Sequence, residues 1–181
     1  MAKVKKSTVC KNVCLSVAIA LALAAFCMLF VTMVETEDRS FKGYQIAMSY
    51  HEYDPSLSIY THVWDFSFFN FSAYMLVLLG IICCVAGIAN KKQGLVLAVL
   101  TMLLFVSAGV LFLCQTGNLQ PHIPDSMKNS DKEVINQYIS SIRDNYQLAT
   151  GAIVAAACSI SAGLVALLSK ITWQVAHAKE E

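Results

Sequence analysis

The sequence has little charge for its length. Only 14% of its 181 residues are Asp, Glu, Lys or Arg, whereas soluble proteins average about 25%, and 57% of its residues are apolar. This composition excludes a disordered tail, a collagen-like chain, a nucleic-acid-binding protein and an ordinary soluble enzyme. The net charge of +1 indicates nothing about function until the positions of the charged residues along the chain are considered.

Four long runs contain no Asp, Glu, Lys, Arg or His at all. As a helix, each run matches a hydrocarbon core about 30 Å thick. Soluble core helices are rarely uncharged on every side over that length, so we predict an all-α membrane protein with a four-transmembrane-helix bundle. The first run lacks a small-residue cleavage pattern and is expected to be a retained anchor rather than a signal peptide. The runs are Val13–Val34, Phe71–Ala89, Gly94–Cys114 and Leu148–Ser169.

Lysine and arginine determine the predicted orientation, because cytoplasmic loops carry an excess of them. With both termini inside, eight of the 13 Lys and Arg residues are inside and ten of the 12 Asp and Glu residues are outside. We therefore predict a multi-pass protein of the cell (plasma) membrane, with both termini cytoplasmic. The segments outside the spans are then the basic N-terminus 1–12, the extracellular loops 35–70 and 115–147, the cytoplasmic turn 90–93 and the cytoplasmic tail 170–181.

The first long loop contains two stretches in which apolar and polar residues alternate. A period of two is typical of a half-buried β-strand, and Asp54-Pro55-Ser56 between the stretches is typical of a turn. We expect a small β-hairpin, which must pack on another element because a lone hairpin is only marginally stable. The alternating positions are Tyr44, Ile46, Met48 and Tyr50 in one stretch, and Leu57, Ile59, Thr61 and Val63 in the other.

The second long loop contains the element expected to cover the hairpin. Pro121 and Pro124 interrupt the chain, and Ser130 with Glu133 matches a capping box at the start of a helix. We predict a helix over residues 131–146 that continues without interruption into the fourth span. Hairpin and helix together would form a small extracellular α+β cap. The apolar positions at helical spacing are Ile135, Tyr138, Ile139, Ile142 and Tyr146.

Small residues recur every four positions along one side of the fourth span. The first span has the same spacing in Ser16, Ala20 and Ala24. Small side chains let helix backbones approach closely in lipid, so we expect the first and fourth spans to pack together within one chain. Self-association through the fourth span is the alternative. The helix-packing residues of the fourth span are Gly151, Ala155, Ser159 and Gly163.

The four predicted spans contain no residue pattern typical of transport or catalysis. They contain no titratable carboxylate, imidazole, amine or guanidinium and no proline, which argues against a transporter that acts alone. No nucleophile–base or carboxylate pair stands at a recognisable spacing, so we predict no catalytic residue and no enzyme. Buried cysteines are expected to act as small apolar residues. For Cys10 and Cys14 we expect unmodified thiols, with palmitoylation as the alternative.

Histidines and carboxylates of the two outer loops follow no established metal-binding spacing. We therefore predict no metal site and no cofactor, and regard these residues as an exposed polar surface. The alternative is a metal site of imidazoles and carboxylates, if the hairpin brings His51 near His62. The residues concerned are His51, Glu52, Asp54, His62, Asp65 and His122.

Aromatic residues crowd the first outer loop, where they can form the core of the cap or a surface for a partner. Tyr and Trp are favoured at protein interfaces, and five of these residues, together with one tyrosine of the second outer loop, are candidates. We expect a non-enzymatic membrane protein that presents its cap to another membrane or surface protein, or to a second copy of itself, as an accessory subunit of a complex. A small oligomeric channel or transport component is the alternative. The candidate surface comprises Tyr44, Tyr50, Tyr53, Tyr60, Trp64 and Tyr138.

Overall fold

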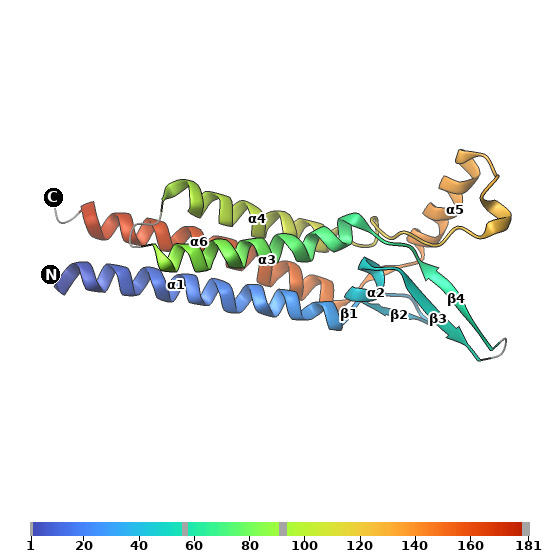
Figure 1. Cartoon of the computed structure of the whole chain (residues 1–181), viewed down its shortest axis with the longest axis horizontal. Coiled ribbons are helices and arrows are strands. Elements are labelled where there is room, and N and C mark those ends of the chain that lie inside the picture. Colours follow the sequence, from blue (N-terminus) through green and yellow to red (C-terminus); the bar gives the residue numbers. More distant parts are fainter. Residues whose placement is uncertain (1, 56–57, 91–93, 179–181) are drawn as a thin grey trace.

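The computed structural model describes residues 2–55, 58–90 and 94–178. It is mostly helical, with four long helices side by side and a small sheet-containing region at one end (Figure 1). Three of the residues predicted to form the turn 90–93 lie outside the described residues. The long helices are α1 (Ala2–Cys27), α3 (Phe68–Ala89), α4 (Leu95–Leu113) and α6 (Thr150–Ala178).

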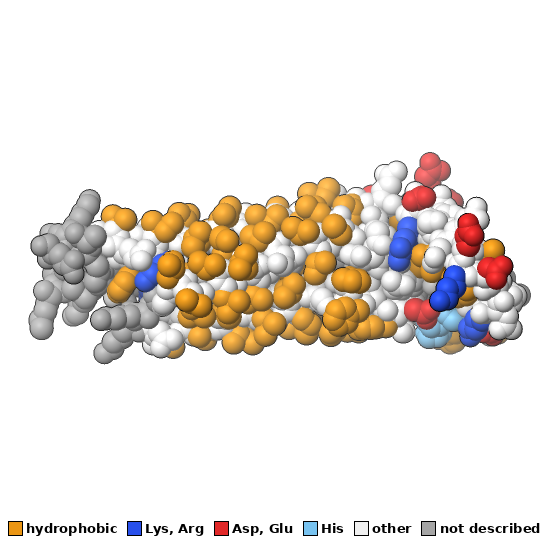
Figure 2. All heavy atoms as spheres, turned by 90° about the horizontal axis from the view of Figure 1, so that it is seen from above, with side chains coloured by type: hydrophobic (Ala, Val, Ile, Leu, Met, Phe, Trp, Pro, Cys, Tyr) orange, Lys and Arg blue, Asp and Glu red, His pale blue; other side chains and the backbone are white. Residues whose placement is uncertain are grey.

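The four helices close a ring of contacts, in which α1 packs on α3, α3 on α4, α4 on α6, and α6 back on α1. Each contains a stretch long and apolar enough to cross a membrane. On the face that Figure 2 shows, hydrophobic side chains cover the bundle and charged side chains gather at the end with the strands. These four helices support a multi-pass membrane protein. The candidate spans are Thr8–Phe30, Phe68–Ala89, Leu95–Leu113 and Thr150–Val175.

The small residues of α6 face inward, toward two different neighbours. A Cβ on Gly151 would collide with the backbone oxygen of Thr32, just beyond α1. A Cβ on Gly163 would lie 3.1 Å from the carbonyl oxygen of Met102 in α4. The stripe is therefore used for close packing inside this chain. Between these glycines, Ala155 and Ser159 are fully buried, and the Ser159 hydroxyl donates to the Phe105 carbonyl of α4 at 2.8 Å.

Two buried lysines, Lys11 of α1 and Lys170 of α6, lie toward the end of the bundle opposite the strands. The Lys11 side chain is fully buried, and its ammonium donates to the carbonyl oxygens of Gly87 at 2.8 Å and Asn90 at 2.6 Å. These carbonyls belong to the C-terminal end of α3, where the last helical C=O groups have no partner within the helix. Lys11 therefore ties α1 to the end of α3.

A three-stranded antiparallel sheet joins the bundle to the region at its end. After α1, the 3₁₀ turn η1 (Met28–Phe30) leads into β1 (Thr32–Glu35), which lies between β2 (Ser40–Lys42) and β5 (Gln147–Leu148). The sheet therefore holds the exit of α1 beside the entry of α6. The first span consequently ends earlier than the predicted run 13–34, because the backbone of the last residues of that run pairs with strands instead of continuing the helix.

The expected hairpin is present but begins later in the chain. Strand β3 (Tyr50–Asp54) pairs antiparallel with β4 (Ile59–Trp64), with Tyr53 opposite Tyr60. The predicted strand over residues 44–48 is wrong, because α2 (Gly43–Ala47) is a turn of helix. A helix places positions 43, 46 and 47 on one side, and all three residues there are buried.

The second connection also differs from its prediction. It contains η2 (Asp125–Met127) and α5 (Lys132–Asp144), whose N-cap is Asp131 rather than Ser130. The prediction that this helix continues into the fourth span is wrong. The chain breaks after α5 because β5 pairs with β1, and the Ala149 amide then donates to the Met33 carbonyl at 3.0 Å. We refer to the part of the protein formed by β1–β5, α2, η2 and α5 as the cap.

Candidate functional site: a histidine-lined cleft in the cap

The cap contains an open cleft of about 600 Å³ between β4, α5 and the chain before η2. Backbone pairing fixes its walls, since Trp64 of β4 forms an isolated bridge with Pro121. The His122 amide donates to the Val63 carbonyl at 3.1 Å beside this bridge. Two connections that are far apart in the sequence are therefore in register at the cleft.

An aromatic cluster forms the floor of the cleft. Trp64 is only 1% exposed, and its ring meets those of Phe41 and Tyr146 edge-on, each at 5.3 Å between centroids. Such edge-to-face pairs stabilise beyond the burial of their area. Burial in this cluster raises the pKa of the Tyr146 phenol, because the charged phenolate would lose its hydration.

Three imidazole rings stack along one side of the cap. His51 and His62 lie opposite each other on β3 and β4, with ring centroids 4.1 Å apart and an interplanar angle of 11°. The other face of His62 stacks on His122 at the same centroid distance, with an angle of 26°. The predicted condition that the hairpin brings His51 near His62 is therefore met, and His122 extends the stack.

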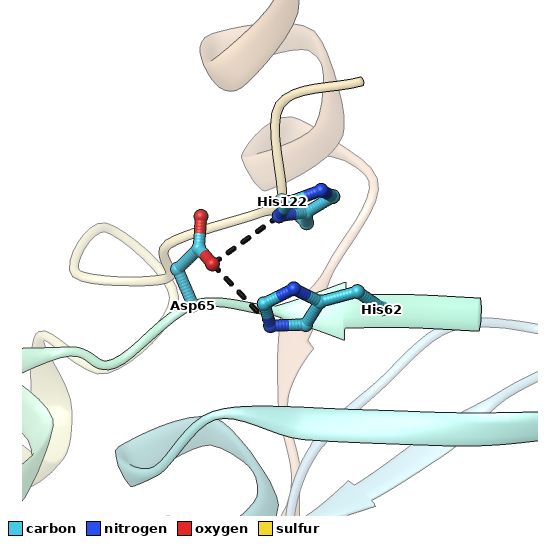
Figure 3. A group of neighbouring side chains, drawn as sticks. All are labelled: His62, Asp65 and His122. Carbon is cyan, nitrogen blue, oxygen red and sulfur yellow. Dashed lines mark hydrogen bonds and ion pairs between the residues drawn. The ribbon is translucent and has the colours of Figure 1, made fainter. Parts of the chain in front are cut away.

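Asp65 faces His62 and His122, two neighbouring rings of this stack, as Figure 3 shows. Its Oδ1 lies 3.2 Å from His122 Nδ1 and 3.3 Å from His62 Nε2. The Trp64 carbonyl oxygen is 2.8 Å from the same His62 nitrogen. These side chains are half-buried, with 23% of His62, 29% of His122 and 46% of Asp65 exposed. The arrangement can share protons between imidazole and carboxylate, and its three groups are all types that bind metal ions.

Other charges near the cleft are solvated. Arg39 in the wall of the cleft lies 3.6 Å from the Glu52 carboxylate, and both side chains are well exposed. Lys128 pairs with Asp125 just beyond the cleft, and this contact lowers the pKa of the Asp125 carboxyl. Exposed pairs of this kind contribute little to stability.

The structure separates the six candidate surface residues into three environments. Tyr53 and Tyr60 are exposed near the tip of the hairpin, where their rings pair at 5.1 Å. Trp64 belongs to the buried cluster. The remaining three, Tyr44, Tyr50 and Tyr138, are half-buried, and Tyr138 lines the cleft.

Sequence reasoning missed the grouping of His62, Asp65 and His122. The pairing of His51 with His62 follows from the hairpin register, but nothing in the local pattern places His122 beside them. That contact depends on the bridge between Trp64 and Pro121, which joins segments more than fifty positions apart.

The cysteines add nothing to this cleft. All seven are free thiols, and none lines the cleft. Comparison of the chain with protein-family models and with curated proteins finds no match.

Proposed function

We propose that this chain is a non-enzymatic, multi-pass protein of the cell membrane whose cap binds another membrane or surface protein. Its termini would be cytoplasmic and its cap extracellular, and it would act as an accessory subunit of a larger complex. The four-helix bundle would hold the cap in a fixed orientation, since β1 and β5 connect the cap directly to α1 and α6.

The projecting hairpin is the observation that carries this proposal. The β3–β4 pair extends away from the bundle in Figure 1. Near its tip Tyr60 is 71% exposed, and Tyr53 and Ile59 are each 50% exposed. Tyrosine combines a large apolar area with a hydroxyl group and little rotamer freedom, which favours it at interfaces. An exposed tyrosine pair at the end of a two-stranded ribbon has the chemistry of a contact site.

The alternative, an oligomeric channel or transport component, relied on packing of small residues between chains. Gly151 and Gly163 instead lie against Thr32 and Met102 of their own chain. The stripe is therefore already occupied, and the alternative loses its main support. Ion or solute flux through liposomes containing only the purified protein would restore it.

A photo-crosslinking amino acid at position 60, in cells that express the chain naturally, tests the proposal. The expected result is one discrete adduct of larger mass with a foreign protein. Ser140, which is exposed on α5, is the matched control position. The adduct should be absent there and should weaken when Tyr53→Ser is added to the chain labelled at position 60.

Two results would contradict the proposal. One is the absence of an adduct at position 60 in native membranes. The other is the same set of adducts at positions 60 and 140, which would mean that both report random collisions rather than a contact site.

A further inference from the structure

We propose that His62, Asp65 and His122 bind a divalent transition-metal ion, with zinc as the preferred ion. The proposal goes beyond the role suggested for the hairpin and does not depend on it, because an ion can bind the purified chain without a protein partner. It reverses our sequence-based expectation that the loops contain no metal site. His51, on which the alternative metal site in the sequence analysis depended, is outside the group.

The distances between the three side chains fit a tetrahedral site. Two atoms that each lie about 2.0 Å from a zinc ion at the tetrahedral angle are about 3.3 Å apart. The Asp65 oxygen lies 3.2 Å from His122 Nδ1 and 3.3 Å from His62 Nε2. All three potential ligand atoms lie within 4.8 Å of one another. The two imidazoles now stack at an interplanar angle of 26°, so for all three groups to bind one ion these rings must approach and tilt until both ring planes meet at the ion.

The donor set selects the class of metal. Imidazole nitrogen suits zinc, copper, nickel and iron, whereas calcium and magnesium prefer sites made of oxygen alone. Asp65 supplies the single negative charge, and neutral His62 and His122 each supply a ring nitrogen. Two nitrogens and one carboxylate are the ligands of several zinc sites that keep a position open.

The position of the group leaves room for a fourth ligand. His62 and His122 line the cleft, so water or an external group can reach an ion held there. The Trp64 carbonyl oxygen, 2.8 Å from His62 Nε2, is a further oxygen at the same place. This arrangement resembles an accessible site rather than a closed structural one.

The backbone brings the three ligands together before any ion binds. His62 and Asp65 lie at the end of β4, and His122 lies on the second connection, as Figure 3 shows. The Asp65 amide donates to the Gln120 carbonyl at 2.8 Å, and the His122 amide donates to the Val63 carbonyl at 3.1 Å. Because these bonds fix the spacing of the segments, an ion would bind at low ordering cost and would clamp the two connections to each other.

Without an ion, the same three side chains can form a hydrogen-bonded cluster. A measurement of metal binding distinguishes such a cluster from a metal site. In such a cluster, the ring N–H of His122 donates to the Asp65 carboxylate and the ring N–H of His62 donates to the Trp64 carbonyl. In a metal site, the same two ring nitrogens must be free of protons and bind the ion through their lone pairs. A purely structural cluster should gain nothing from zinc, whereas a metal site should bind one ion per chain.

The test uses the full chain in detergent, without a histidine tag and after treatment with a chelator. Calorimetric titration with zinc should give one ion per chain, and zinc should raise the thermal unfolding temperature. Cobalt(II) should give the strong visible absorption of tetrahedral coordination, which a weakly held octahedral ion lacks. The cobalt spectrum is measured on the unaltered chain, so it does not depend on any variant folding.

Two matched pairs of variants locate the site. Asp65→Asn and His122→Gln should weaken zinc binding by at least the roughly 10–100-fold typical of losing even an outer partner of a metal ligand. Asp125→Asn makes the same chemical change as Asp65→Asn at a neighbouring carboxylate outside the site, and should leave zinc binding within about twofold, well below that loss. His51→Gln removes a ring that stacks on His62 without being a ligand, so it should weaken zinc binding less than His122→Gln does.

The proposal is overturned if the unaltered chain binds less than one zinc ion or gives no tetrahedral cobalt spectrum. It is also overturned if all four variants weaken zinc binding equally, because that pattern indicates general attraction to the cap surface. Neither result affects the crosslinking test at position 60, so the two proposals fail separately.

Discussion

At the scale of single residues, Trp64 connects the cleft to the stability of the cap. Its indole fills the space between Phe41 and Tyr146, while its ring nitrogen has no hydrogen-bond partner among the residues that the structure describes. The residue was a candidate for a binding surface, yet it serves as the core on which that surface is built. Packing and recognition are therefore separable by mutation.

Replacing this indole tests the separation. Trp64→Ala should destabilise the cap by about 3–5 kcal/mol, since it removes a fully buried aromatic side chain and leaves a cavity. Limited proteolysis of the protein in detergent reports the opening of the cap. Tyr60→Ala, at an exposed position, should leave the cleavage rate nearly unchanged. Equal cleavage rates for the two variants would show that the cluster does not stabilise the cap.

Lys11 gives a second prediction at this scale. Lys11→Met keeps a long apolar stem but removes the ammonium that donates to the Gly87 and Asn90 carbonyls. Bonds to charged groups are each worth about 1.5–3 kcal/mol, so the thermal unfolding temperature of the bundle should fall. Lys132→Met, at an exposed position in the cap, is the control and should have little effect. An unchanged unfolding temperature for Lys11→Met would mean that water replaces the ammonium.

At the scale of elements, the sequence predicted the long helices better than the short ones. Charge-free runs identify the spans because only a helix can satisfy the backbone of such a run in lipid. Alternation was a reliable guide for residues 59–63, which lie in β4, and a misleading one for residues 44–48. Over so few residues, the same sequence is compatible with a strand and with a single turn of helix. The chain forms the helical turn α2, which buries Ile46 and Ala47.

The break between α5 and α6 has the same kind of cause. The apolar spacing up to Tyr146 favours a continuous helix, but strand β1 offers backbone partners to Gln147 and Leu148. Those partners lie more than a hundred positions earlier in the chain, so no local sequence pattern predicts the pairing. The three candidate metal ligands were named among the loop residues, but their grouping was not predicted for the same reason, since His122 meets His62 only through a long-range bridge.

Glycine substitutions test how tightly α6 packs at this junction. Gly151→Ala places a Cβ against the Thr32 backbone and 3.2 Å from the Met33 sulfur. Neither strand β1 nor α6 can shift without disturbing the other, so the variant should lose about 1–3 kcal/mol through overpacking. Gly94→Ala is the control, because nothing lies within 4 Å of its added Cβ. Thermal unfolding in detergent compares them, and a similar unfolding temperature for both would show that the junction is loosely packed.

At the scale of the whole molecule, polarity is distributed along the long axis. Charged side chains gather over the cap, whereas hydrophobic side chains cover the bundle on the face seen in Figure 2. The excess of lysine and arginine in the segments at the other end led us to propose that this end is cytoplasmic. The hairpin tip and the metal-binding group would then both face the outside of the cell, where a surface partner and free ions are accessible to them.

Cysteine labelling tests this orientation in intact cells. In a variant whose native cysteines are replaced by alanine or serine, Ser140→Cys introduces one thiol in the exposed face of α5. A second variant retains only Cys10, which is exposed at the opposite end of the bundle. A membrane-impermeant maleimide should label position 140 in intact cells and should label Cys10 only after the cells are opened. The reverse pattern would place the cap in the cytoplasm and would contradict the extracellular partner that we propose. The proposed metal site does not depend on the side of the membrane, so its own test would still apply.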